Sequence, residues 1–113
     1  MNNTITRNEL RDAIEAGEVT VVEALPASYY EDAHLPGAIN IPHTEVRALA
    51  PALLPDKDAA IVTYCANTAC PNSDIAATVL GKLGYTNVRD YVEGKQGWRE
   101  AGLPLEQGAP VAG

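Results

Sequence analysis

The stretch Thr63–Tyr85, TYCANTACPNSDIAATVLGKLGY, carries the end of an apolar run, a short polar loop and a helix. The run that it completes, DAAIVTYC, has the length and composition of a strand buried in the middle of a sheet. The helix is expected to start with Asn72 or Ser73 as its N-cap and to end before Gly84. We expect its buried stripe to consist of Ile75, Val79, Leu80 and Leu83. Cys65 therefore closes a central strand just before a helix N-terminus, where a thiolate is stabilised.

The segments on both sides of this stretch alternate between helix and strand. Thr6 and Glu9 have capping-box spacing and predict an N-terminal helix over residues 6–16. Short strands are expected in VTVVEAL, AINIP and TNVRDYV, with a helix in EVRALAPALL that Thr44 caps and Pro51 interrupts or shortens. This alternation favours an α/β fold with a parallel sheet covered on both faces. Binding sites in such sheets lie beyond the carboxyl ends of the strands, which is where the thiol described above is found.

Length, charge and cysteine content limit the class of protein. With 113 residues, we expect a single domain over 1–113, with its core at about 19–105 and a flexible tail at 106–113. The net charge of −7, from 8 basic and 15 acidic residues, argues against nucleic acid and anionic membranes as partners. The sequence has no apolar run of membrane-spanning length and no secretory signal at its start, and two cysteines are too few for a disulfide framework. We therefore expect a cytoplasmic protein.

Position alone allows two interpretations of Cys65. One is a small buried residue at a strand end, since free cysteines are often buried and unreactive. The other is a nucleophile, because the loop that follows has no large apolar residue to bury the thiol. Backbone N–H groups of that loop can form an anion-binding nest, which lowers a thiol pKa from about 8.5. The candidate substrate- or anion-binding loop consists of Ala66, Asn67, Thr68, Ala69, Cys70, Pro71, Asn72 and Ser73.

Four segments of the chain resemble the single-domain rhodanese-like sulfurtransferase family. They are AHLPGAINIP (33–42), IVTYC (61–65), AATVLGKLGYTNVRDYVEG (76–94) and GWREAGLP (97–104), and they occur in the family's order. The resemblance implies a rhodanese-like fold, with a central, mostly parallel five-stranded sheet flanked by helices on both faces. It also implies that Cys65 accepts sulfane sulfur from a small donor as a persulfide and passes it to a thiol or cyanide, with no cofactor.

The chain departs from the family pattern at two places near the expected site. The family commonly has an Asp-x-Arg pair after its first core strand, where this chain has Glu23 and Leu25. Glu23 is expected to keep a supporting hydrogen-bonding role. The family's loop ends in Arg-Ser or Arg-Thr, whereas this one ends in Asn72 and Ser73 and is about two residues longer. Because no Lys or Arg lies in the loop, we expect thiosulfate, a doubly charged donor, to be used poorly.

The remaining candidate residues each have a structural and a functional interpretation. Cys70 is either a loop residue of serine-like size or a resolving thiol, and the second requires a loop that curls around Cys65. His34 is expected to support the turn in AHLPGA through a ring hydrogen bond to the backbone. A zinc site from both cysteines, His34 and His43 is disfavoured because Cys-x4-Cys is not a usual zinc spacing, so no metal is expected. Trp98 is expected to pack in the core or at its rim.

Four functions compete on these residues. The first is sulfur transfer through a Cys65 persulfide. The second, a cysteine phosphatase or arsenate reductase on the related fold, is disfavoured because Pro71 occupies the place of the oxyanion-clamping arginine. The third is a non-catalytic module that carries sulfur for, or docks to, a partner protein. The fourth is a redox sensor that uses the Cys65/Cys70 dithiol.

Overall fold

The computed structural model describes residues 3–108. The strands in this part of the chain are β1 (Asn3–Thr4), β2 (Thr20–Glu23), β3 (Ile39–Asn40), β4 (Ile61–Tyr64) and β5 (Val88–Tyr91). The helices are α1 (Arg7–Ala16), α2 (Ala27–Asp32), the 3₁₀ helix η1 (His43–Glu45), α3 (Val46–Leu53), α4 (Asn72–Lys82) and α5 (Gly94–Glu100).

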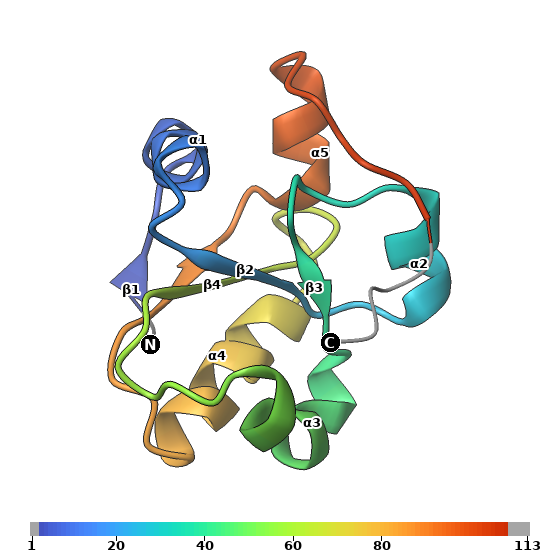
Figure 1. The fold of residues 1–113 in the computed structure, drawn as a ribbon. Helices are drawn as coiled ribbons and strands as arrows, with labels where there is room; N and C mark the ends of the chain where they lie inside the picture. Colours follow the sequence, from blue (N-terminus) through green and yellow to red (C-terminus); the bar gives the residue numbers. More distant parts are fainter. Residues whose placement is uncertain (1–2, 109–113) are drawn as a thin grey trace.

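The strands form one sheet in the order β1-β5-β4-β2-β3, and every neighbouring pair is parallel. Helices α1 and α5 lie on one side of this sheet and α3 and α4 on the other, with α2 beyond the β3 edge (Figure 1). The predicted α/β fold with helices on both faces is therefore confirmed. The short β1, which no periodic pattern in the sequence indicated, adds an edge strand beside β5.

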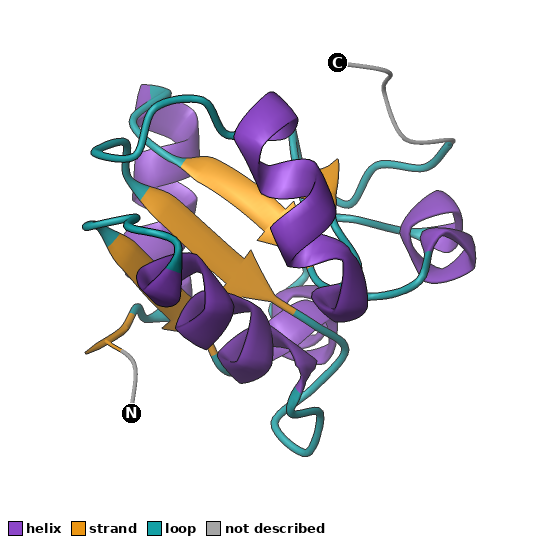
Figure 2. Cartoon of the chain, turned by 90° about the horizontal axis from the view of Figure 1, so that it is seen from below, coloured by secondary structure: helices purple, strands orange, loops and turns teal. Residues whose placement is uncertain are grey.

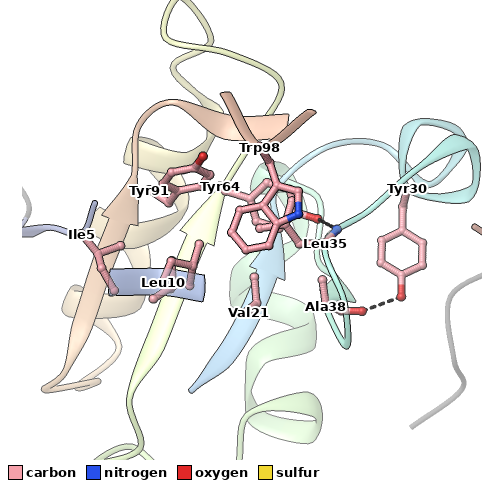
Figure 3. Packing of buried hydrophobic residues seen from close by; sticks show 10 residues of the cluster. Ile5, Leu10, Val21, Tyr30, Leu35, Ala38, Tyr64, Tyr91 and Trp98 are labelled. Carbon is pink, nitrogen blue, oxygen red and sulfur yellow. Dashed lines mark hydrogen bonds between the residues drawn. The ribbon is translucent and has the colours of Figure 1, made fainter. Parts of the chain in front are cut away.

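Alternate residues of the central strands feed two separate hydrophobic clusters. Val21 and Tyr64 point toward the α1 and α5 side, where they pack with Leu10 and Trp98 (Figure 3). Val62 belongs to the same cluster. The opposite cluster contains residues of β2, β4, α3 and α4, among them Val22, Ile61, Ala50 and Leu80. Figure 2, seen from below, shows helices α3 and α4 in front of the strands on that second face.

Helix α4 differs in detail from its sequence prediction. It begins at Asn72 after Pro71 and has no side-chain N-cap hydrogen bond. Ile75 was expected in the core but is 41% exposed, whereas Ala76 and Ala77 are fully buried. Two adjacent alanines let the helix approach the sheet closely, and this turns the larger Ile75 side chain toward solvent. The prediction for Ile75 is therefore wrong.

The start of α1 agrees with its sequence prediction, whereas the start of α3 does not. The predicted capping box is present at the start of α1, where the Thr6 and Glu9 side chains each accept a hydrogen bond from the other residue's backbone N–H. Thr44 does not cap the next predicted helix, because it lies inside η1. Pro51 lies inside α3, which ends two residues later at Leu53.

The chain after α5 folds back onto the turn after α2. Glu106 exchanges two backbone hydrogen bonds with His34, of 2.9 and 2.8 Å, and its Oε1 accepts one from the N–H of Gly37 at 2.9 Å. Gly108 donates to the carbonyl of Glu31 at 3.0 Å. The sequence predicted a flexible tail over residues 106–113, of which Glu106 and Gly108 make these hydrogen bonds. The rest of the predicted tail, 109–113, lies outside the described residues.

Candidate active site

Cys65 follows the last residue of β4, a central strand of the sheet, at the sheet's carboxyl edge. Only 1% of the residue is exposed. Side chains alternate along β4, so that Tyr64 points to the α1 and α5 side and Thr63 to the α4 side. The Thr63 hydroxyl donates to the carbonyl of Ser73 at 2.9 Å. This bond fixes the first turn of α4 against the end of the strand.

Two polar groups contact the sulfur of Cys65. The thiol donates to the carbonyl oxygen of Cys70 at 3.2 Å, and the hydroxyl of Ser73 lies 3.6 Å from the sulfur. Burial, followed by hydrogen bonding with Cys70, raises the pKa of Cys65 to about 11, although the Ser73 hydroxyl and backbone N–H lower it. In this conformation the thiol is buried and protonated.

This environment differs from the expected anion-binding nest. The loop curls into a turn in which the Cys70 N–H donates to the carbonyl of Asn67 at 3.2 Å and the Ala69 N–H donates to Asn67 Oδ1 at 3.0 Å. These N–H groups are therefore bonded within the loop, and the Cys70 carbonyl faces the sulfur. The prediction of a lowered Cys65 pKa is wrong for this conformation, because burial, and after it the Cys70 carbonyl oxygen, disfavours the thiolate.

The backbone around Cys65 is held by the start of α5, which lies beside the loop after β4 (Figure 1). The Lys95 N–H donates to the Cys65 carbonyl and the Gln96 N–H donates to the Ala66 carbonyl, both at 2.9 Å. Gly94 permits this close approach, since a Cβ there would lie 2.5 Å from the Cys65 carbonyl oxygen, and its φ of +66° also favours glycine.

A buried polar network lies on the other face of the sheet, behind the cysteine. Tyr64 donates to Glu23 Oε1 at 2.7 Å. It also accepts from the Leu35 N–H at 3.0 Å (Figure 3). Lys95 Nζ lies 3.2 Å from Glu23 Oε2, and it also donates to the carbonyls of Ala33 at 2.7 Å and Tyr29 at 2.9 Å.

The family commonly has an arginine at the position of Leu25. In this chain the positive charge next to Glu23 comes instead from Lys95. Burial raises the pKa of the Glu23 carboxyl, while the Tyr64 hydrogen bond and the Lys95 charge lower it. Sequence analysis missed Lys95 because it is 72 residues from Glu23. The surrounding segment EGKQGWRE also contains Glu93, Gln96 and Arg99, so its composition did not mark Lys95 as buried.

His34 supports a different part of the fold. Its Nδ1 lies 2.8 Å from the carbonyl of Tyr30, and its ring stacks on that of Tyr30 with 3.7 Å between centroids. Its Nε2 lies 3.7 Å from Glu106 Oε1. The predicted ring-to-backbone hydrogen bond is present. Tyr30 lies in α2, and Glu106 lies in the segment after α5 that covers the following turn. His34 therefore stabilises this turn, which lies outside the loop after β4.

Two hollows flank the loop. One of about 370 Å³ lies on the side of β5, and its lining includes Cys70, Ser73, Asp74 and Asp90. The other, of about 300 Å³, lies beside Ala66 and Asn67, where α5 contributes Lys95, Gln96 and Arg99 and α2 contributes Tyr29 and Asp32. Sequence analysis did not single out Asp90 or Arg99.

Within residues 3–108, no group of three or more His, Cys, Asp and Glu side chains is arranged to hold a metal ion. Over the same residues, the structure contains no helix with the length and apolar character needed to cross a bilayer. Both cysteines are free, with Cys65 buried and Cys70 half-buried.

Comparisons with known proteins identify the family of the chain. The model for the rhodanese-like domain matches residues 6–101. The HTH-type transcriptional regulator Rv0324 of Mycobacterium tuberculosis is 41% identical over 109 residues, which cover 96% of this chain and 47% of that protein. Thiosulfate sulfurtransferase PspE of Escherichia coli is 34% identical over 79 residues, which cover 70% of each protein.

Solved structures agree with this assignment. The crystal structure of the BH2092 protein from Bacillus halodurans has a TM-score of 0.87 and 26% identity, covering 99% of this chain and 82% of that one. The chain spans about half the length of the mycobacterial regulator and 70% of PspE. With a family match over residues 6–101 and the same fold in a solved structure, the chain belongs to the family of rhodanese-like domains.

Proposed function

We propose that this chain is a sulfurtransferase that carries sulfane sulfur as a persulfide on Cys65 and passes it to a thiol or to cyanide. The observation that carries the proposal is the position of Cys65, a free thiol between the carboxyl end of β4 and the first turn of α4. PspE, a relative with 34% identity, is named a thiosulfate sulfurtransferase. Two reduced thiols suit a reducing compartment, so we propose a cytoplasmic location.

The transfer needs no oxidant or cofactor. The Cys65 thiolate attacks the outer sulfur of a donor R–S–SH, which forms Cys65–S–SH and releases R–S⁻. An acceptor thiolate R′–S⁻ then attacks the outer sulfur of the persulfide. The product is R′–S–SH, and the Cys65 thiolate is released and takes up a proton. Each step exchanges one sulfur–sulfur bond for another.

The buried thiol requires the loop to move before the first step. With a pKa of about 11, roughly one Cys65 in ten thousand is ionised at pH 7. Displacement of Cys70 from the sulfur removes a contact that raises this pKa and leaves the contacts with Ser73, which lower it. We therefore assign the described conformation to a resting state, and the attack to a state in which Cys70 has moved away.

The donor is proposed to carry little charge. The loop residues 66–73 include no Lys or Arg. Of the two cations at the neighbouring hollow, Lys95 is bound to Glu23, and Arg99 shares the hollow with the acidic Asp32. A persulfide or polysulfide is therefore a better donor than thiosulfate, whose two charges this site does not neutralise.

The test is turnover with a sulfane donor and cyanide or a thiol as acceptor. Cys65→Ser should abolish turnover, because an alcohol is a far weaker nucleophile near neutral pH. Cys70→Ser, the matched change of the other thiol, should keep the transfer. Wild-type turnover by Cys65→Ser with any sulfane donor would exclude the assignment.

A second function, a sulfur or redox sensor, is favoured by two observations. The relative with 41% identity is named a transcriptional regulator. The loop also curls toward Cys65, whose sulfur lies 3.2 Å from the backbone carbonyl of Cys70, and so keeps Cys70 beside the nucleophile. Attack of the Cys70 thiol on the inner sulfur of Cys65–S–SH forms a Cys65–Cys70 disulfide and releases H₂S, which balances without an oxidant.

Mild peroxide oxidation followed by thiol mapping tests this second function. A sensor should form the Cys65–Cys70 disulfide, and Cys70→Ser should be inactivated faster because its Cys65 sulfenic acid oxidises further. If no such disulfide forms and Cys70→Ser is as resistant to peroxide as the wild type, Cys70 is a loop residue only.

A further inference from the structure

The 370 Å³ hollow beside β5 has an acidic, hydroxyl-rich lining. It lies at the carboxyl edge of the sheet, between the loop after β4 and the end of β5. Two acidic residues, Asp74 and Asp90, line it together with Thr4, Thr68 and Ser73, and no Lys, Arg or His among residues 3–108 belongs to this lining. An anion is repelled here, whereas a cation or a hydrogen-bond donor is favoured.

Asp90 is the unusual member of this lining. It is 5% exposed, and among the described residues its Oδ1 has no hydrogen-bond partner. Its partner in the sheet register is Thr63, so it lies on the α4 side of β5, facing Ser73. Burial raises the pKa of Asp90, although a hydrogen bond from Ser73 lowers it. Ser73 therefore satisfies the Asp90 carboxylate only in part, and Oδ1 is a buried acceptor that a donor group of a ligand can bind.

Single residues separate the hollow from the sulfur of Cys65. Ser73 lines the hollow, and its hydroxyl lies 3.6 Å from Cys65 Sγ. Cys70 also lines the hollow, and its carbonyl lies 3.2 Å from the same sulfur. The two residues form the wall between the hollow and Cys65. Displacement of Cys70, which the first transfer step already requires, opens this wall.

We propose that this hollow binds the sulfur acceptor, that the acceptor is a thiol bearing an ammonium group, and that Asp90 binds this ammonium. The inference rests on the proposed persulfide function of Cys65. An ammonium group supplies the donor that Asp90 Oδ1 lacks and a charge that the acidic lining favours. The thiol of the same small molecule then reaches the outer sulfur of the persulfide.

The step balances as a simple exchange. The acceptor ⁺H₃N–R–SH loses its thiol proton to solvent, and its sulfur bonds to the outer sulfur of Cys65–S–SH. The products are ⁺H₃N–R–S–SH and the Cys65 thiolate, which takes up a proton. The ammonium is unchanged throughout, so it serves only to orient the acceptor.

Three acceptors of similar size and different charge test the proposal: cysteamine, 2-mercaptoethanol and 3-mercaptopropionate. Wild type, Asp90→Asn and the control Glu18→Gln, which removes an exposed carboxylate before β2, are each loaded with sulfur, and KM for each acceptor is measured. Asp90→Asn should raise KM for cysteamine about tenfold, the size of a lost charge-assisted bond, and leave that for 2-mercaptoethanol unchanged. The ratio of the variant's KM to the wild-type KM is compared between acceptors, because this ratio cancels the different reactivities of the three thiols.

A second variant guards against a folding defect in Asp90→Asn. Val92 lines the same hollow and is 41% exposed, so Val92→Lys should fold, raise KM for cysteamine and lower that for 3-mercaptopropionate. If both variants change all three acceptors equally, or none, the acceptor site is overturned while the persulfide function stands.

A separate binding measurement tests the ammonium site if Cys65 forms no persulfide. If wild type accepts no sulfur, the binding claim is measured with ethylammonium, which has no thiol, from amide chemical shifts of Ser73 and Asp90. Saturable shifts that Asp90→Asn abolishes would support the ammonium site, and their absence in wild type would overturn it.

Discussion

Replacement of Lys95 by methionine tests the buried network behind the cysteine. Methionine has a similar length and flexibility but no charge and no donors. In Lys95→Met, the carbonyls of Tyr29 and Ala33 lose the donor that lies 2.9 and 2.7 Å away. Glu23, whose side chain is 0% exposed, loses the ammonium at 3.2 Å and keeps its hydrogen bond from Tyr64.

The expected loss of stability follows from burial. At 3.2 Å, two unit charges interact by about 5 kcal/mol at an effective dielectric constant of 20. Removing one partner of a buried pair typically costs about 3–5 kcal/mol, because the other charge stays buried without compensation. We expect a loss in the free energy of unfolding of about 4 kcal/mol, a large part of the stability of a domain of this size.

Equilibrium unfolding in urea measures this loss. With an m-value of about 2 kcal/mol/M, the midpoint should fall by about 2 M. Lys82→Met on the exposed side of α4 is the control and should change the free energy of unfolding by no more than about 0.5 kcal/mol. The double variant Lys95→Met/Glu23→Gln should recover part of the loss, because it leaves no unpaired charge.

The pH dependence of the Lys95→Met loss gives a second check. Without the ammonium, the pKa of Glu23 in the folded state rises further above its unfolded value. Stability from such a group is present at low pH and is lost as the pH rises through the folded pKa. The loss should therefore be smaller at pH 5 than at pH 8. A loss below about 1 kcal/mol at pH 8 would refute the role of Lys95 as the partner of Glu23.

Three further outcomes are expected. In Cys70→Ser, the rate of Cys65 alkylation should rise about tenfold per pH unit between pH 7 and 9, because burial raises the pKa of this thiol. A rate that levels off near pH 8 would contradict a buried neutral thiol. Asp90→Asn should raise the Tm at pH 8, because burial raises the pKa of Asp90 and so makes its charged form costly to the fold. This gain should shrink as the pH falls through the raised pKa and should be absent well below the unfolded value of about 3.9; an equal Tm at pH 8 would count against a costly buried charge. Asn72→Arg should lower KM for thiosulfate relative to Asn72→Gln; equal values would show that loop charge does not limit this donor.

The parts of the fold with a local cause were predictable from the sequence. The capping box of Thr6 and Glu9 marks the start of α1, and the apolar run before Cys65 marks the buried strand β4. Strand β1, at Asn3–Thr4, has only two residues and depends on pairing with β5. No periodic pattern fits in two residues, so this strand was not identified from the sequence.

Several features of the site depend on contacts between distant segments or on backbone direction. Lys95 reaches Glu23 from 72 residues further along the chain, and Asp90 faces Ser73 because of the register between β4 and β5. The sequence of the loop allowed its N–H groups to point at Cys65, but the turn at Asn67 bonds them within the loop and presents the Cys70 carbonyl. Residue types alone do not determine that peptide orientation.

Mass spectrometry of Cys65 after exposure to a sulfane donor is the most direct test of sulfur transfer. Wild type and Cys70→Ser are incubated with glutathione persulfide, and the peptide that contains Cys65 is mapped before and after addition of a thiol acceptor. The proposed function predicts the mass of one added sulfur atom on Cys65 in both proteins, and its loss as acceptor persulfide appears. A Cys65 peptide without added sulfur, from folded protein and with polysulfide as well as glutathione persulfide, would contradict it.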